Sequence, residues 1–136
     1  MYKKIVVPVD MGQMDKGEKI LAKAQALLDQ GGSIVLVSIV EAVPTYLTID
    51  LPVDFINVSV KDAEAKLAAL DAKFSANAKQ IVRVGSPARE IMEVAEKEAA
   101  DLIVIASHQP DFSNYLIGAT ADRVVRHAKC SVLVDR

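Results

Sequence analysis

A segment near the end of the chain has the residue types of an anion-binding site. Leu102–Ala106 is a continuous apolar run, typical of a strand buried on both faces. A polar loop at 107–114 follows, and Gly118, Ala119 and Thr120 then begin a predicted helix. A helix N-terminus presents free N–H groups and the positive end of the helix dipole, which could together hold a phosphate. Alternatively, Gly118 only permits a tight turn, and Thr120 is the N-cap of the helix.

The residues after Gly118 complete a strand–helix–strand unit. Apolar residues recur at the i, i+3, i+4, i+7 spacing of a helix packed on a sheet: Ala121, Val124, Val125 and Ala128. A second apolar run then predicts a buried strand made of Ser131, Val132, Leu133 and Val134. The pattern predicts a βαβ unit with a candidate phosphate site at the entrance of its helix.

The other reactive side chains do not form a recognisable catalytic or metal-binding set. His108 is a candidate for phosphate contact or acid–base chemistry, or else a loop histidine without such a role. His127 falls on the polar side of the last helix, and Cys130 is expected to be a small core residue. Two separate histidines and one cysteine do not make a metal site.

Composition limits the size and the environment of the protein. The 136 residues leave room for one domain, 1–136, and 51% of them are hydrophobic and 25% charged. A net charge of −2 gives no basic field for nucleic acid. No apolar run approaches the roughly 20 residues of a membrane span, and a single cysteine fits a reducing compartment. We therefore expect a cytoplasmic protein that binds neither nucleic acid nor membrane.

Strands and helices alternate along the chain. Apolar runs predict further strands at 3–9, 33–40 and 78–84. Helices are predicted at 17–30, along the apolar stripe 60–74, and after Ser86 and Pro87, which suit the N-cap and the first helical position. Gly31 and Gly32 are expected to end the first helix. Five strands alternating with four helices predict an α/β fold, a doubly wound parallel sheet with helices on both faces.

Residues 41–57 interrupt this alternation. They contain Pro44 and Pro52 without a clear apolar period, and they are too many for an ordinary connection. One interpretation is a surface loop with its own small cluster. The other is a lid or an oligomer contact, because the apolar side chains would be costly to expose.

The C-terminal segment resembles that of the universal stress protein family. The family motif is Gly, two residues, Gly, nine residues, then Gly followed by Ser or Thr, on an ATP-binding α/β fold. Here Gly118 and the sequence RVVRHAKCSVLV match the family's ending. Ala106 and Gln109 replace the first two glycines, Ala119 replaces the Ser or Thr, and the loop is one residue shorter. Side chains at these positions limit the approach of backbone to phosphate, so residues 107–109 could contribute side-chain contacts instead.

The resemblance implies the sheet order 3-2-1-4-5 and an ATP site at the point where the connections reverse direction. The first and fourth strands are then neighbours, and a crevice opens at their C-terminal ends. The residues that the resemblance brings to this nucleotide site are Pro8, Val9, Asp10, Ile39, Val40, Ala106, Ser107, His108, Gln109, Gly118, Ala119 and Thr120.

Specific roles follow from the resemblance for the ends of the first two strands. The backbone at Ile39 or Val40 would pair with adenine. Asp10 could accept ribose hydroxyls or help to hold a phosphate-bound Mg²⁺. Alternatively, the Asp10 carboxylate caps the loop that follows it.

The last strand is expected to lie at a sheet edge in this order. Its unpaired N–H and C=O groups favour a homodimer or higher homo-oligomer, although a monomer whose own loop covers the edge is an alternative. The expected function is a stress-response regulator whose oligomerisation is biased by bound ATP. The alternatives are a slow ATPase or phosphotransferase, and an interaction module whose altered pocket binds no nucleotide.

Overall fold

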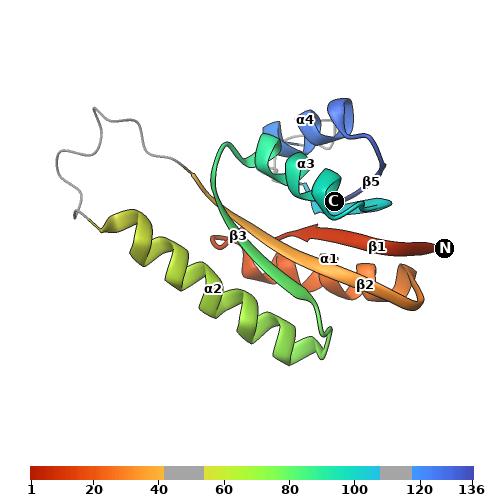
Figure 1. The fold of residues 1–136 in the computed structure, drawn as a ribbon, viewed down its shortest axis with the longest axis horizontal. Coiled ribbons are helices and arrows are strands. Elements are labelled where there is room, and N and C mark those ends of the chain that lie inside the picture. Colours follow the sequence, from red (N-terminus) through yellow and green to blue (C-terminus); the bar gives the residue numbers. More distant parts are fainter. Residues whose placement is uncertain (42–53, 108–117) are drawn as a thin grey trace.

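The protein is built on a five-stranded parallel β-sheet, seen in a computed structural model that describes residues 1–41, 54–107 and 118–136 (Figure 1). The strand order β3-β2-β1-β4-β5 confirms the predicted order and the doubly wound α/β class. In chain order the elements are β1 (Tyr2–Pro8), α1 (Met14–Leu27), β2 (Leu28–Glu41), α2 (Phe55–Phe74), β3 (Lys79–Gly85), α3 (Pro87–Lys97), β4 (Leu102–Ala106), α4 (Ala119–His127) and β5 (Ser131–Asp135).

Helices cover both faces of the sheet (Figure 1). On one face, Leu67 of α2 joins α1 residues in a buried cluster with Ile5 and Val7 of β1. On the other face, Val124 of α4 and residues of α3 pack with Val6. Successive residues of β1 thus enter opposite clusters, as strand geometry requires. Burial of both faces explains why the strands are continuous apolar runs in the sequence. No helix in the described ranges is long and apolar enough to cross a membrane.

The winding of the sheet reverses at β1. This strand pairs in parallel with β2 on one side and with β4 on the other. The chain leaves β1 through α1 towards β2 and β3, and it returns through α3 to β4 on the opposite side of β1. Connections that leave in opposite directions cover opposite faces, so a crevice opens at the C-terminal ends of β1 and β4.

The predicted boundary between the first helix and the second strand is wrong. α1 begins at Met14 and ends at Leu27, and Gly31 and Gly32 lie inside β2. The early part of β2 pairs with β1 through a register shift between Tyr2 and Lys4. The glycines therefore occur in an irregular strand start and not at a helix stop, because long-range pairing outweighed the local signal.

Predictions for the other helices are partly wrong. α2 begins at Phe55, so the end of the predicted loop 41–57 is helical. Residues 42–53 lie outside the described residues, so neither interpretation of that loop is tested. Ser86 holds the predicted N-cap position of α3 without a side-chain capping hydrogen bond. Val125, predicted to face the sheet, is 45% exposed, because α4 turns Ala121 and Val124 inward instead.

A carboxylate joins the first and fourth strands at their N-terminal ends. The N–H groups of Lys3 and Lys4 donate to the two carboxylate oxygens of Asp101, at 2.9 and 3.0 Å. The Asp101 N–H donates in return to the Lys4 carbonyl at 3.0 Å. Burial by itself would raise the pKa of the Asp101 carboxyl, but the hydrogen bonds from Lys3 and Lys4 bring that pKa below its ordinary value of 3.8. The ionised form therefore stabilises the junction of β1 with β4.

We predict that Asp101→Asn lowers the free energy of unfolding by about 1–3 kcal/mol at neutral pH, since a carboxylate that accepts two N–H groups is lost. Because the folded-state pKa is lowered, this contribution is complete above the unfolded pKa and is lost as the pH falls through the folded value. Urea unfolding at several pH values measures it. Asp62→Asn, which removes an exposed carboxylate 3.2 Å from Lys66, is the control. An Asp101→Asn deficit that does not decrease as the pH falls would contradict this account.

Candidate functional site

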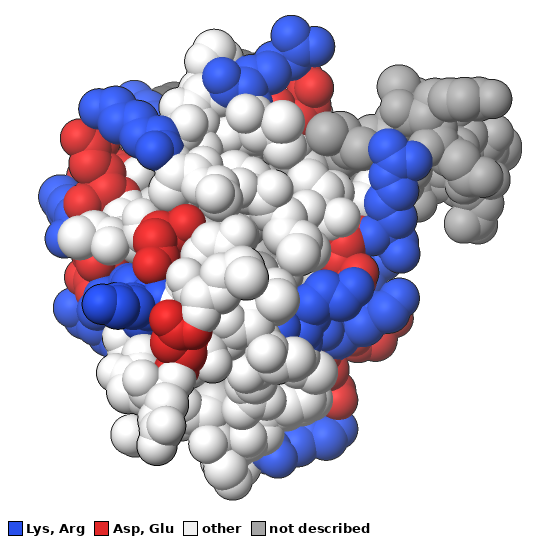
Figure 2. All heavy atoms as spheres, turned by 90° about the vertical axis from the view of Figure 1, so that its right-hand side faces the viewer, with Lys and Arg blue, Asp and Glu red and all other residues white. Residues whose placement is uncertain are grey.

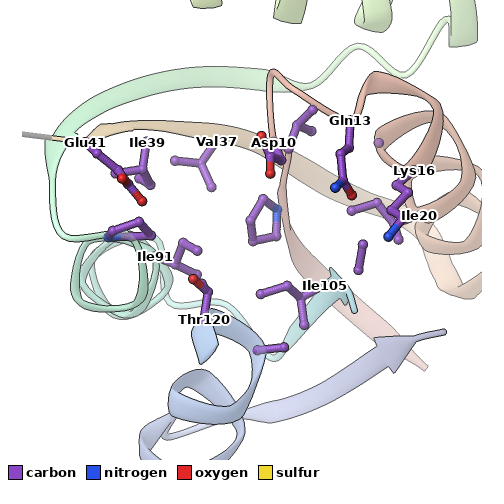
Figure 3. A pocket seen from close by; sticks show the side chains of 16 residues that line it. Asp10, Gln13, Lys16, Ile20, Val37, Ile39, Glu41, Ile91, Ile105 and Thr120 are labelled. Carbon is purple, nitrogen blue, oxygen red and sulfur yellow. The ribbon is translucent and has the colours of Figure 1, made fainter. Parts of the chain in front are cut away.

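A pocket of about 270 Å³ lies at the C-terminal ends of the central strands (Figure 3). Its walls come from the C-terminal parts of β1, β2 and β4, from the first two turns of α1 and α3, and from the first turn of α4. These are the elements that border the reversal at β1, so the pocket occupies the crevice that the topology predicts. The residues that line it are Pro8, Val9, Asp10, Gln13, Lys16, Gly17, Ile20, Val37, Ile39, Glu41, Pro87, Ile91, Ile105, Ala106, Thr120 and Ala121.

The pocket combines a mainly apolar wall with a few polar groups. Aliphatic side chains of the strands and helices supply most of the lining. The polar side chains are those of Asp10, Gln13, Lys16, Glu41 and Thr120. This composition is typical of a small-molecule site, in which apolar surface gives contact area and a few polar groups fix orientation.

Asp10 lies two residues after the end of β1, and its carboxylate faces the pocket (Figure 3). Its Oδ1 accepts the Gly12 N–H at 2.8 Å, and its backbone carbonyl accepts the Gln13 N–H at 3.0 Å. The carboxylate thus shapes the turn into α1, as the capping alternative predicted. A carboxylate has about four acceptor positions, so a turn contact and a ligand contact are compatible.

Lys16 lines the pocket, although no sequence pattern had predicted it there. Its ammonium donates to the carbonyl of Ser107 at 3.0 Å. The predicted first helix started at residue 17, which left Lys16 in a loop; α1 in fact starts at Met14 and presents Lys16 from its first turn. A correct helix start after β1 would have revealed it, because first-turn residues of such a helix face the C-terminal edge of a parallel sheet.

Ser107, whose carbonyl accepts this hydrogen bond, is itself fixed by β5. Its N–H donates to the Asp135 carbonyl at 2.8 Å, which extends the pairing of β4 with β5 by one residue. The residue is 5% exposed, and its hydroxyl has no hydrogen-bond partner in the part of the chain that the structure describes. A buried hydroxyl without a partner carries a desolvation cost.

The structure brings together part of the predicted site. Pro8, Val9, Asp10, Ile39, Ala106 and Thr120 line the pocket, whereas Val40, Ser107, Gly118 and Ala119 do not. Val40 faces away from the pocket because side chains alternate along β2, and its neighbours Ile39 and Glu41 both face the pocket. Gly118 is the N-cap of α4, with a φ of 76°. His108 and Gln109 lie outside the described residues.

The remaining candidates lie away from this pocket. His127 and Cys130 border a second cavity of about 180 Å³ between α3 and α4. Burial, and to a smaller extent the charge of Asp101, raise the pKa of the Cys130 thiol. A raised pKa leaves less thiolate at neutral pH. Among the described residues, no group of three or more His, Cys, Asp or Glu side chains could hold a metal ion.

The fold and the pocket define a doubly wound α/β protein with a ligand crevice at its topological switch point. The chain belongs to the universal stress protein family, whose profile matches residues 1–136. It is similar to Universal stress protein G of Shigella flexneri, with 34% identity over 142 residues that cover 100% of each chain. The predicted family is therefore confirmed.

Solved structures share this fold. UspA from Lactobacillus plantarum matches with a TM-score of 0.70 and 25% identity, over 99% of this chain and 98% of that chain. The universal stress protein from Archaeoglobus fulgidus in complex with dAMP matches with a TM-score of 0.63 and 20% identity, over 99% of this chain and 98% of that one. Both likenesses confirm the architecture around the pocket.

The close approach of α1 to the end of β1 depends on Gly17. A Cβ at this buried position would lie 2.8 Å from Cγ1 of Val9. We predict that Gly17→Ala lowers the melting temperature, because the clash outweighs the gain of about 1 kcal/mol that Ala usually brings inside a helix. Gly12→Ala is the control, since its Cβ would lie 3.4 Å from Asp10 Oδ1. A higher melting temperature for Gly17→Ala would show that the contact between α1 and Val9 has room for a methyl group.

Proposed function

We propose that this protein binds an adenine nucleotide, ATP included, in the pocket at the C-terminal ends of β1, β2 and β4. The observation that carries the proposal is the combination of an apolar crevice with a few polar groups at a topological switch point. The Archaeoglobus fulgidus universal stress protein, which shares the fold, is known in complex with dAMP. That relative supports an adenine ligand for this chain.

The pocket suits the three parts of such a ligand. Ile39 and Ile91 offer apolar surface to a planar base, and the end of β2 offers backbone groups beside it. Asp10 would accept hydrogen bonds from ribose hydroxyls. Thr120, in the first turn of α4, would meet a phosphate together with the free N–H groups of that helix.

A metal ion would come with the nucleotide and not be held by the protein alone. The pocket offers two carboxylates, Asp10 and Glu41. Mg²⁺ typically keeps several waters and takes one or two carboxylates plus the substrate phosphates. Asp10 would therefore contribute one ligand to a Mg²⁺ that is already bound to ATP.

The biological output that we propose is regulation through self-association. β5 lies at an edge of the sheet, and β4 is its one neighbour among the strands that the structure describes. The Asp135 carbonyl faces β4, because it accepts the Ser107 N–H. By alternation along the strand, the N–H groups of Val132 and Val134 face the free edge, where a second copy could pair with them. The bound nucleotide would act as a ligand that biases this association.

Ala106→Leu tests the nucleotide site, because three extra carbons at this position would occupy part of the pocket. Isothermal titration of the unmodified protein with AMP, and with ATP plus Mg²⁺, should show saturable heat. We expect the variant to bind at least about tenfold more weakly, a loss of roughly 1.4 kcal/mol. Ala68→Leu, on the exposed side of α2, should bind normally. Absence of heat with either nucleotide at millimolar concentration would refute adenine nucleotide binding.

Val134→Pro tests the edge, because proline removes the outward N–H and cannot continue the pairing. The variant should sediment as a monomer at a concentration at which the unmodified protein is a dimer. Its circular dichroism should remain helical. Val134→Ala is the matched control: it loses apolar side chain but keeps the N–H, so it should remain dimeric. If the unmodified protein is already monomeric at micromolar concentration, the edge-pairing proposal fails.

A further inference from the structure

The ammonium group of Lys16 is a half-buried cation that has no carboxylate partner among the residues that the structure describes. Elsewhere in the described chain, lysines lie within 3.9 Å of a carboxylate: Lys4, Lys19, Lys23, Lys66, Lys73, Lys79, Lys97 and Lys129. On the face in Figure 2, Lys and Arg side chains lie beside Asp and Glu around an uncharged centre. Lys3 and Lys61 are exposed to solvent. Lys16 alone among the described lysines is both partly buried and unmatched in charge.

The hydrogen bond of Lys16 does not neutralise its charge. The ammonium donates to the Ser107 carbonyl at 3.0 Å, and a carbonyl carries only a partial negative charge. This contact uses one of three N–H donors. It also holds the flexible side chain in one position, so less side-chain entropy would be lost when an anion binds. The remaining donors and the full positive charge suit an anionic group.

The arrangement of charged side chains favours one orientation of a ligand that carries a phosphate. Lys16 of α1 and the N-cap residue Gln13 lie on one side of the pocket, whereas Ile39 and Glu41 of β2 lie on the other (Figure 3). The carboxylates of Asp10 and Glu41 would repel a phosphate, and the Lys16 ammonium would attract it. A ligand whose base lies against Ile39 would therefore extend its phosphates away from Glu41, towards Thr120 at the start of α4 and Lys16 of α1.

We propose that Lys16 recognises the phosphate together with the start of α4, and that its charge makes the pocket select adenine nucleotides over adenosine. The inference rests on the proposed nucleotide function and adds the residue that distinguishes phosphorylated from unphosphorylated ligands. It also accounts for an anion site in a chain that has Ala106 where the family has a glycine. A side-chain cation reaches a phosphate at a distance that the backbone there cannot.

Titration of adenosine and of AMP, at one fixed ionic strength, tests the inference on four proteins. These are the unmodified chain, Lys16→Met, Lys16→Arg and Lys61→Met. The methionine keeps most of the apolar stem and removes the charge, and the arginine keeps the charge. Lys61→Met removes the same charge from an exposed site on α2. Adenosine affinity serves as the internal measure of an intact pocket, since adenosine carries no phosphate.

The unmodified protein should bind AMP more tightly than adenosine. Lys16→Met should lower AMP affinity about tenfold or more, because a charge-assisted hydrogen bond typically contributes a free energy of that size. The same variant should leave adenosine affinity within about twofold. Lys16→Arg and Lys61→Met should retain the preference for AMP. If Lys16→Met keeps that preference, or if the unmodified protein shows none, the role of Lys16 is refuted while adenine binding stands. If neither ligand binds the unmodified protein, both the nucleotide function and the role of Lys16 are refuted.

Discussion

The double pairing of β1 is the constraint on which the rest of the structure depends. This strand is hydrogen-bonded to β2 on one side and to β4 on the other, and Ile5, Val6 and Val7 are fully buried. Each face of the strand then needs its own helical cover, which α1 and α2 provide on one side and α3 and α4 on the other (Figure 1). The reversal of winding that follows from this arrangement opens the pocket at the end of the same strand.

Polar contacts at the C-terminal edge of the sheet connect the pocket with the edge strand. The Ser107 carbonyl accepts Lys16 from the pocket wall, while the Ser107 N–H donates to Asp135 of β5. The Asp135 carboxylate in turn lies 2.5 Å from the Lys23 ammonium of α1. A few residues therefore contact the pocket, the first helix and the edge strand together. The regulation that we propose would require a ligand at Lys16 to influence pairing at β5, and these contacts lie between the two.

The sequence predicted several strand-end residues of the site and Thr120 at the start of α4, but it missed Lys16 at the start of α1 and Glu41 at the end of β2. Pro8, Asp10 and Ala106 follow from apolar runs and from the family resemblance, and they line the pocket. Lys16 was missed because no residue before α1 gives a strong capping signal; Gln13 is the N-cap and makes no side-chain capping hydrogen bond. Glu41 was missed because the end of β2 merges into the aperiodic segment at 41–57.

The sequence by itself determined the class of fold, the family and the order of the elements. Runs such as Leu102–Ala106 are long enough to identify a buried strand, and the ending after Gly118 matches that of the family. Only the tertiary structure decided where β2 starts, which face of α4 is buried, and that Lys16 reaches Ser107. The physical reason is the range of the interactions. Apolar periodicity is local and can be seen along the chain, whereas strand register and the partner of a charged side chain depend on residues far apart in sequence, such as positions 16 and 107.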